Sequence, residues 1–304
     1  MQNEFSHLFR SHQESLVYYN FIDDVINDDT RRIYKSGINE LLKWCTSNGV
    51  LPFAADRNDL LRYQRDLVLQ NHSARTINLR IVIARRLYKA AIQSGIIQSD
   101  PTFGLHTLTD RGSRTLQTNY VSAASLNAIT AVLPSDNSEE SLRAKAIIQL
   151  IANQGLRIVD LYYLSEEGLD FRTKSAVYTI ADQNKYIFFR DEVWEAIVLY
   201  LAARGKSKTD SIGTPLFRAR GNRAGGKRLS RDSLRDIVNA IYEKAGIKED
   251  GIVCYTLRHT FAQRLYSKTN DLRLVQEELR LKTLTPTYRY SDVIDLEEYR
   301  VQLA

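Results

Sequence analysis

The feature that most constrains the fold is a helical spacing of apolar residues through the first hundred positions. Within 30–48, apolar side chains recur every three or four residues, which is the period of an amphipathic helix. Segments 56–70 and 73–94 have the same spacing, Ser73 is suited to cap the second of them, and a further helix is expected at about 12–26. No β-strand is needed here, so this part of the chain predicts a helical domain.

The pattern changes after a segment that has no helical period. Residues 99–120 contain Pro101 and two glycines, which is typical of a connection rather than of a helix. We therefore expect a helical domain at 1–105, a linker at 106–120 and a second domain at 121–304.

The second domain has a mixed pattern. Segments 176–180 and 186–189 contain β-branched and aromatic residues on either side of the turn 181–185, which predicts a β-hairpin. Helices are expected at 122–133, 139–153, 157–164, 191–203, 230–245, 256–268, 271–280 and 286–291. The predicted fold class is mainly α, with a helical N-terminal domain and a mixed, mostly helical C-terminal domain that holds a small antiparallel sheet.

The balance of charge favours an anionic partner. The chain has 42 Lys and Arg against 36 Asp and Glu, a net charge of +6, which suits DNA or RNA but is shared by many proteins that bind neither. No apolar run reaches the length of a membrane span, and the two cysteines and five scattered histidines form no metal-ligand spacing. We expect a cytoplasmic protein without cofactor, metal or membrane contact, associated with the nucleoid if it binds DNA.

Two groups of basic residues are candidates for contact with phosphates. The group in segment 73–94 consists of Arg75, Arg80, Arg86 and Lys89, and the group in loop 204–228 consists of Arg218, Arg220, Arg223 and Lys227. By default such residues form a solvated helix face and a solvated loop. In a DNA enzyme they would position the duplex rather than read its sequence.

Three segments contain residue types that suit phosphodiester transfer. NQGLRIV contains Arg157, YTLRHT contains Arg258, and TPTYRY contains Tyr288 and Tyr290. Two guanidiniums can bind the non-bridging oxygens and stabilise a pentacoordinate phosphorus, a phenol can attack, and an acid can protonate the departing 5′ oxygen. Any basic protein contains such residues by chance, so these residue types alone are not specific.

The arrangement of these segments resembles a known family. Gly-Leu-Arg157-Ile-Val-Asp160-Leu is similar to the first arginine box of the tyrosine recombinases, the family of lambda integrase, Xer and Cre, and Thr256-Leu257-Arg258-His259-Thr260 is similar to the second. Tyr290 follows Arg258 by 290 − 258 = 32 residues, a separation common in simple members. The resemblance covers almost the whole chain and implies an Xer-like or Cre-like enzyme, which cleaves and rejoins DNA through a 3′-phosphotyrosine and a Holliday junction.

The resemblance also implies roles for single residues. Arg157 and Arg258 would clamp the scissile phosphate, and Tyr290 would be the nucleophile. Tyr288 is its rival, but residues two apart on a helix point to different sides, and the spacing favours Tyr290. Lys185, in the predicted hairpin turn, would be the general acid.

Two positions depart from the family pattern. Tyr255 stands where the family has the first histidine of its second box, and Leu281 stands nine residues before Tyr290, where the family has histidine or tryptophan. A phenol is a poor base near neutral pH and leucine donates no hydrogen bond, although it can pack. Whether Lys282 or His259 compensates stays open at this point, and Asp160 is expected to be structural.

The resemblance implies partners as well. It implies double-stranded DNA with inverted-repeat core sites and a homotetramer on that DNA, with a monomer or dimer off it. The alternatives are a catalytically weakened DNA-binding architectural or regulatory protein on the same fold, and a type IB topoisomerase. Segment 293–304 would either close its own core or be exchanged between subunits.

Overall fold

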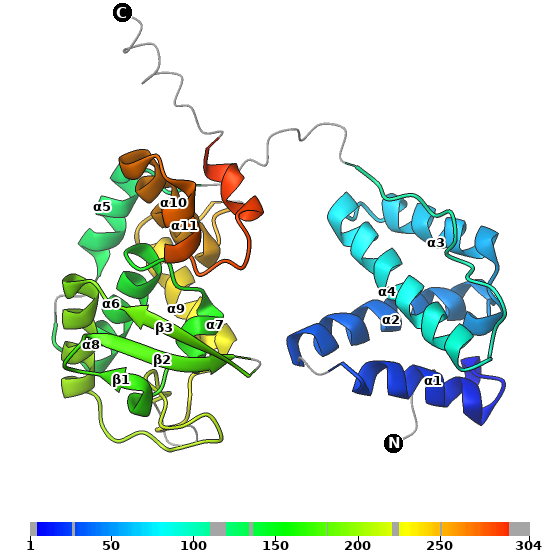
Figure 1. Cartoon of the computed structure of the whole chain (residues 1–304), viewed down its shortest axis with the longest axis horizontal. Coiled ribbons are helices and arrows are strands. Elements are labelled where there is room, and N and C mark those ends of the chain that lie inside the picture. The colour runs from blue at the N-terminus through cyan, green and yellow to red at the C-terminus, as the bar shows by residue number, and fades with distance from the viewer. Residues whose placement is uncertain are drawn as a thin grey trace, which may run out of the picture. The chain divides into compact units, whose positions relative to one another are not determined.

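The chain divides into two compact units in a computed structural model (Figure 1). The units are Met1–Thr115 and Leu116–Ala304. The structure describes residues 5–25, 28–109, 120–133, 136–180, 182–220, 225–249 and 251–291. Most of the predicted linker and the whole of segment 293–304 lie outside these residues. None of the described helices is both long enough and apolar enough to span a membrane.

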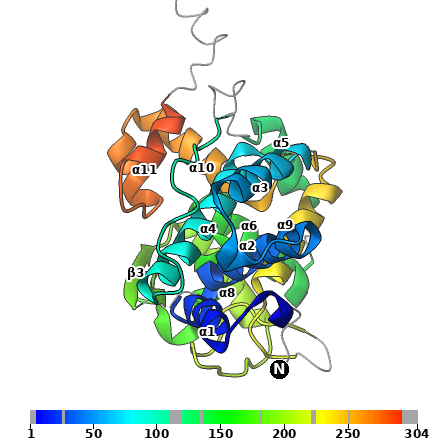
Figure 2. The ribbon, with the colours of Figure 1, turned by 90° about the vertical axis from the view of Figure 1, so that its right-hand side faces the viewer.

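The N-terminal unit is a bundle of helices. Its elements are α1 (His12–Asp23), α2 (Asp28–Asn48), α3 (Arg57–Leu69) and α4 (Ala74–Gln93), with short 3-10 helices at Ser6–Leu8 and Pro52–Ala54. The side chain of Ser73 accepts a hydrogen bond from the backbone N–H of Thr76 and so caps α4 as expected. Helices α2 and α4 pack side by side, as Figures 1 and 2 both show, around buried side chains such as Ile38, Leu42 and Leu87. All four predicted helices are confirmed.

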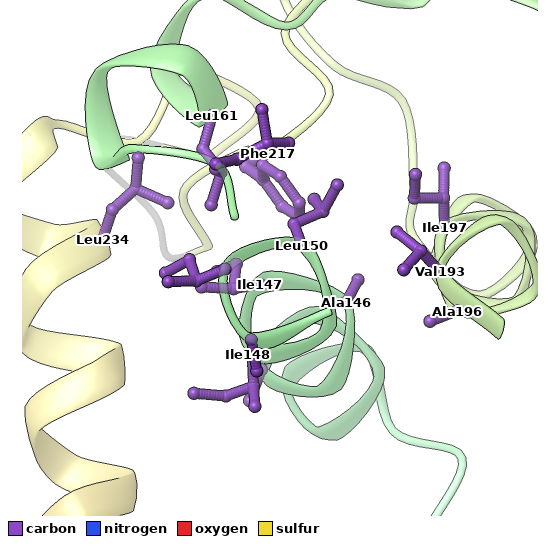
Figure 3. Close-up of a cluster of buried hydrophobic side chains, with 14 of the residues drawn as sticks. Ala146, Ile147, Ile148, Leu150, Leu161, Val193, Ala196, Ile197, Phe217 and Leu234 are labelled. Carbon is purple, nitrogen blue, oxygen red and sulfur yellow. The ribbon is translucent and has the colours of Figure 1, made fainter. Parts of the chain in front are cut away.

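The C-terminal unit is built around a helix, α6 (Glu139–Ala152), most of whose residues are buried. Its helices are α5 (Ala123–Val132), α6 (Glu139–Ala152), α7 (Ile158–Tyr163), α8 (Asp191–Ala203), α9 (Arg231–Lys244), α10 (Cys254–Thr269) and α11 (Leu272–Glu278), with 3-10 helices at Glu166–Gly168 and η4 (Thr285–Tyr290). Helix α6 packs its Leu150 toward Val193 of α8 and its Ile147 toward Leu234 of α9 (Figure 3). The apolar residues of α6 thus form the centre of this unit's core.

The sheet differs from the prediction in one respect that matters for the site. It is antiparallel in the order β1 (Leu169–Asp170), β2 (Ser175–Ile180), β3 (Gln183–Phe188). Because Ile180 pairs with Gln183, the ladder extends through residues that we expected to form a turn, and Lys185 lies within β3 opposite Tyr178. The predicted turn 181–185 was therefore wrong, while the small antiparallel sheet and the mainly α fold class are confirmed.

Candidate active site

Arg157 stands at the start of α7, in the first arginine box. Its Nε and Nη2 atoms donate to the two carboxylate oxygens of Asp160 at 3.1 and 2.9 Å, and its backbone N–H donates to the same group. Burial acts to raise the pKa of the Asp160 carboxyl, but the Arg157 guanidinium outweighs it and holds that pKa below its usual value. The carboxylate takes two of the five guanidinium N–H groups, so it orients Arg157 and leaves donors for a ligand.

Arg258 comes from α10 and is only 1% exposed. Its Nη1 atom donates to the carbonyl oxygen of Gly155, and its Nη2 atom donates to that of Leu279 at 2.7 Å. The guanidinium thus joins the turn before α7 to the end of α11. Arg258 also lies close enough to Arg157 and Asp160 to interact electrostatically with both, so the fold brings the two arginine boxes together.

Tyr290 ends η4 and is 3% exposed, whereas Tyr288 is 51% exposed. The Tyr290 ring packs in a small apolar cluster with Phe261, Ala262, Val275 and Leu279. Its hydroxyl lies 2.8 Å from Nδ1 of His259. Burial raises the pKa of the Tyr290 phenol well above its ordinary value, so the hydroxyl holds its proton firmly unless a base is supplied.

His259 and Tyr255 lie on the same face of α10. Their ring centroids are 4.7 Å apart in an edge-on arrangement, and Tyr255 is exposed. Burial, followed by the nearby charges of Arg289 and Arg258, lowers the pKa of His259 to about 4. The imidazole is therefore neutral at pH 7.

The other two candidates are Lys185 and Leu281, and the Lys185 ammonium donates to Oε1 of Gln183 at 3.4 Å. Lys185 is half-buried, shares a sheet face with Ile187, and faces Tyr178 across the ladder. Tyr178 in turn lies beside Asp160 and Arg157. Leu281 packs against the cluster that contains Tyr290, so this position offers an apolar contact in place of a donor.

Sequence reasoning missed Arg280. Its backbone has φ +54°, a left-handed conformation that favours glycine, and its Nη2 atom donates to the carbonyl oxygen of Gln154 at 3.2 Å. Its Nε atom is buried and has no hydrogen-bond partner among the described residues, close to Asp160 and Arg258. Neither helical spacing nor the family boxes contain a signal for this third arginine beside the site, which is half-buried.

The basic candidates of the N-terminal unit lie on α4 with different partners. Arg75 and Lys89 are exposed, Arg80 makes a long contact with Ser36, and Arg86 donates to the Tyr34 hydroxyl while lying over its ring. Arg86 is exposed as well, and its contact with Tyr34 holds the guanidinium in place.

The basic candidates of the C-terminal unit are mostly ion-paired. Arg218 pairs with Glu139 at 2.6 Å and both side chains are nearly buried, while Arg220 pairs with Glu140. Lys227 is exposed, and Arg223 lies outside the described residues. Across the described ranges, no cluster of His, Cys, Asp and Glu side chains is placed to hold a metal ion.

Comparison with known proteins gives the family. The sequence model of the phage integrase family matches residues 119–296, more than half of the chain, and the protein belongs to that family. It is 27% identical over 271 residues to tyrosine recombinase XerC of Thermodesulfovibrio yellowstonii, covering 87% of this chain and 85% of the relative. It is also 27% identical over 270 residues to tyrosine recombinase XerD of Bifidobacterium longum, covering 86% and 85%.

Solved structures agree on the fold. The Tn1549 transposon integrase in complex with transposon right end DNA superposes with a TM-score of 0.72 at 16% identity, covering 96% of this chain and 98% of that one. The XerH site-specific recombinase bound to palindromic difH substrate superposes with a TM-score of 0.71 at 16% identity, covering 90% and 79%. Because both structures are only 16% identical to this chain, the superpositions support the fold of the protein and nothing further.

Proposed function

We propose that this protein is a site-specific DNA recombinase in which Tyr290 attacks the scissile phosphate. The observation that carries the proposal is the contact between the Tyr290 hydroxyl and His259, which are 2.8 Å apart. His259 lies on α10, the helix that also contains Arg258, and the chain belongs to the phage integrase family. With Arg157, which interacts electrostatically with Arg258, three segments far apart in the sequence supply the groups that a phosphoryl-transfer site requires.

The proposed reaction needs few groups. The guanidiniums of Arg157 and Arg258 bind the non-bridging oxygens and stabilise the charge of the pentacoordinate phosphorus. The Tyr290 hydroxyl gives its proton to a base as its oxygen bonds to phosphorus, the bond to the 5′ oxygen breaks, and the Lys185 ammonium gives that oxygen its proton. The 3′-phosphotyrosine conserves the bond energy, so a 5′ hydroxyl from a partner strand can reverse the step and form a Holliday junction without ATP.

Access to the site is part of the proposal. Tyr290 and Arg258 are 3% and 1% exposed, so a phosphate can reach them only after neighbouring side chains move. We propose that DNA binding moves the side chains that cover Tyr290 and Arg258. Cleavage would then be limited to the protein assembled on its site.

The proposed partners follow the family. The solved relatives include an integrase and a recombinase whose structures contain DNA. For this chain we propose double-stranded DNA with inverted-repeat core sites, a homotetramer on that DNA, and a cytoplasmic, nucleoid-associated location.

A second candidate is a DNA-binding architectural or regulatory protein on the same fold. Leu281 favours it, because an apolar side chain packs where the family has a hydrogen-bond donor. The contact between His259 and Tyr290 favours the enzyme, because a binding protein has no need of a base beside a buried phenol.

Trapping of the covalent adduct tests the proposal. A duplex selected by the protein from a random-sequence pool is nicked near its centre, so that the cleaved end diffuses away. We expect a denaturant-resistant adduct with wild type and with Tyr288→Phe, and none with Tyr290→Phe. Tight binding of the selected duplex without any adduct would favour the binding protein instead.

A further inference from the structure

His259 is the only residue for which the structure gives a hydrogen bond to the Tyr290 side chain among the described parts of the chain. The two residues are 31 positions apart, and the contact joins α10 to η4. On α10, Tyr255, Arg258 and His259 occupy positions i, i+3 and i+4, which place them on one face. The helix that supplies a phosphate-binding arginine therefore also presents an imidazole to the phenol.

Several titratable groups face His259. From its own helix these are Tyr255, edge-on to the imidazole, and Arg258. From η4 they are Arg289 and Tyr290, and the hydroxyl of Tyr120 contacts the Arg289 carbonyl oxygen beside them. Burial of the ring and the charges of Arg289 and Arg258 all disfavour the imidazolium. The ring that contacts the Tyr290 hydroxyl is therefore neutral, and one of its nitrogens carries a lone pair.

We propose that His259 is the base that takes the Tyr290 proton as the phenol attacks phosphorus, in place of the histidine that this chain lacks at Tyr255. The role rests on the proposed function. The imidazole begins as the Nε2–H tautomer, with the lone pair of Nδ1 on the Tyr290 hydroxyl. As the bond between oxygen and phosphorus forms, the proton passes to Nδ1 and gives an imidazolium. In the reverse step that proton returns to the phenol.

The neighbouring groups suit this role less well. Tyr255 is exposed, and its ring contacts the His259 ring rather than donating to or accepting from the Tyr290 hydroxyl. Lys282 is exposed, and an ammonium has no lone pair to offer. His259 alone among these three combines a free lone pair with contact to the reacting oxygen.

A merely structural hydrogen bond would anchor Tyr290 without taking its proton. The two roles differ in their pH dependence. With a base whose pKa is about 4, cleavage by wild type should be nearly independent of pH above about pH 5. Without that base the rate should follow the phenolate fraction, which rises about tenfold for each pH unit while the pH stays below the phenol pKa.

The experiment measures single-turnover adduct formation on the selected, nicked duplex with wild type, His259→Ala and His259→Gln. We expect a loss of about 100-fold or more at neutral pH in both variants, and a rate that rises with pH only in the variants. Fluorotyrosine at position 290, which lowers the phenol pKa, should raise the rate of His259→Ala far more than that of wild type. Because this comparison is made within one variant background, a loss of folding stability in His259→Ala does not obscure it.

Two results separate the possible failures. Variants within about threefold of wild type, or variants that are slower with an unchanged pH profile and no response to fluorotyrosine, would overturn the role of His259 alone. The absence of any adduct with wild type would overturn the proposed function, and the role with it.

Discussion

At the scale of single residues, Lys185 shows how strand register decides a proposed role. It lies within β3 opposite Tyr178, on the sheet face that carries Ile187, and Tyr178 lies beside Arg157 and Asp160. A strand fixes the face of the sheet from which a side chain extends, whereas an open turn does not. This placement supports its proposed role as the acid that protonates the departing 5′ oxygen.

Lys185→Ala tests that role through the leaving group. We expect cleavage of ordinary DNA to fall by about 100-fold or more, because the 5′ oxygen would leave unprotonated. If sulfur replaces that bridging oxygen, the loss should largely disappear, because a thiolate leaves without a proton. Lys174→Ala is the matched control, since this exposed lysine lies in the turn between β1 and β2 and pairs with Asp191. An equal defect on both substrates would exclude Lys185 as the acid.

Asp160→Asn tests the support of Arg157. The native carboxyl has a lowered pKa, so its ionisation stabilises the fold above the unfolded pKa of about 3.9 and loses this effect as the pH falls through the folded pKa. We expect a loss of about 2–3 kcal/mol at neutral pH, below the value for a fully buried pair because the Arg157 side chain is 35% exposed. Urea unfolding should show the difference shrinking under acidic conditions. An equal difference at neutral and acidic pH would contradict this assignment.

The sequence predicted some members of the site and not others, for a physical reason. The boxes around Arg157 and Arg258 and the spacing to Tyr290 are local or family signals, and the fold brings the two arginines together. The contact between His259 and Tyr290 spans 31 residues and depends on how η4 packs against α10. The backbone of Arg280 adopts a left-handed conformation that non-glycine residues rarely adopt, and the spacing of apolar residues contains no signal for it.

At the scale of elements, the long helices were predictable because each buries one face with a regular period. α2, α3 and α4 lie where that period predicted them, and capping by Asp56 and Ser73 fixes where α3 and α4 begin. The hairpin was located correctly, but its turn was predicted too long, because the polar residues at 183–185 suggest a turn although the ladder continues through them. The predicted helix at 286–291 is the 3-10 helix Thr285–Tyr290.

The turn between α6 and α7 gives a prediction at this scale. Gly155 has φ +65°, and a Cβ there would lie 2.4 and 2.7 Å from ring atoms of Phe261. Gly155→Ala should therefore destabilise the protein by about 2–4 kcal/mol and lower cleavage, since the Gly155 carbonyl also holds Arg258.

Gly246→Ala is the control for backbone strain. Gly246 has φ +68°, but a Cβ at this position would meet nothing within 4 Å, so only the left-handed conformation should cost stability, about 1 kcal/mol. Thermal or urea unfolding of both variants measures the difference. Equal losses would mean that Phe261 moves aside and that packing at the turn does not hold Arg258.

At the scale of the whole molecule, the chain combines two separate cores with an excess of six positive charges. Binding of DNA by such a protein is dominated by phosphates and weakens as salt rises. The basic candidates differ in availability, because Lys227 is exposed whereas Arg218 is held by Glu139.

Lys227→Ala should therefore reduce the dependence of DNA affinity on salt. If Lys227 contacts one phosphate, the slope of log affinity against log salt should fall in magnitude by about one. Arg218→Ala should instead lower folding stability, because it leaves Glu139 nearly buried without its partner. Fluorescence anisotropy over a range of salt concentrations measures the slope, and an unchanged slope for Lys227→Ala would remove it from the DNA interface.

The identity of the attacking residue can be measured directly, because Arg289 separates the two rival tyrosines. Trypsin cleaves after Lys282, Arg289 and Arg300, so Tyr288 and Tyr290 fall in the different peptides 283–289 and 290–300. We would digest the trapped protein–DNA adduct with trypsin and nuclease and locate the nucleotide by mass spectrometry. The account predicts a phosphodiester on Tyr290 in peptide 290–300. A nucleotide on Tyr288 in peptide 283–289 would contradict the proposed nucleophile.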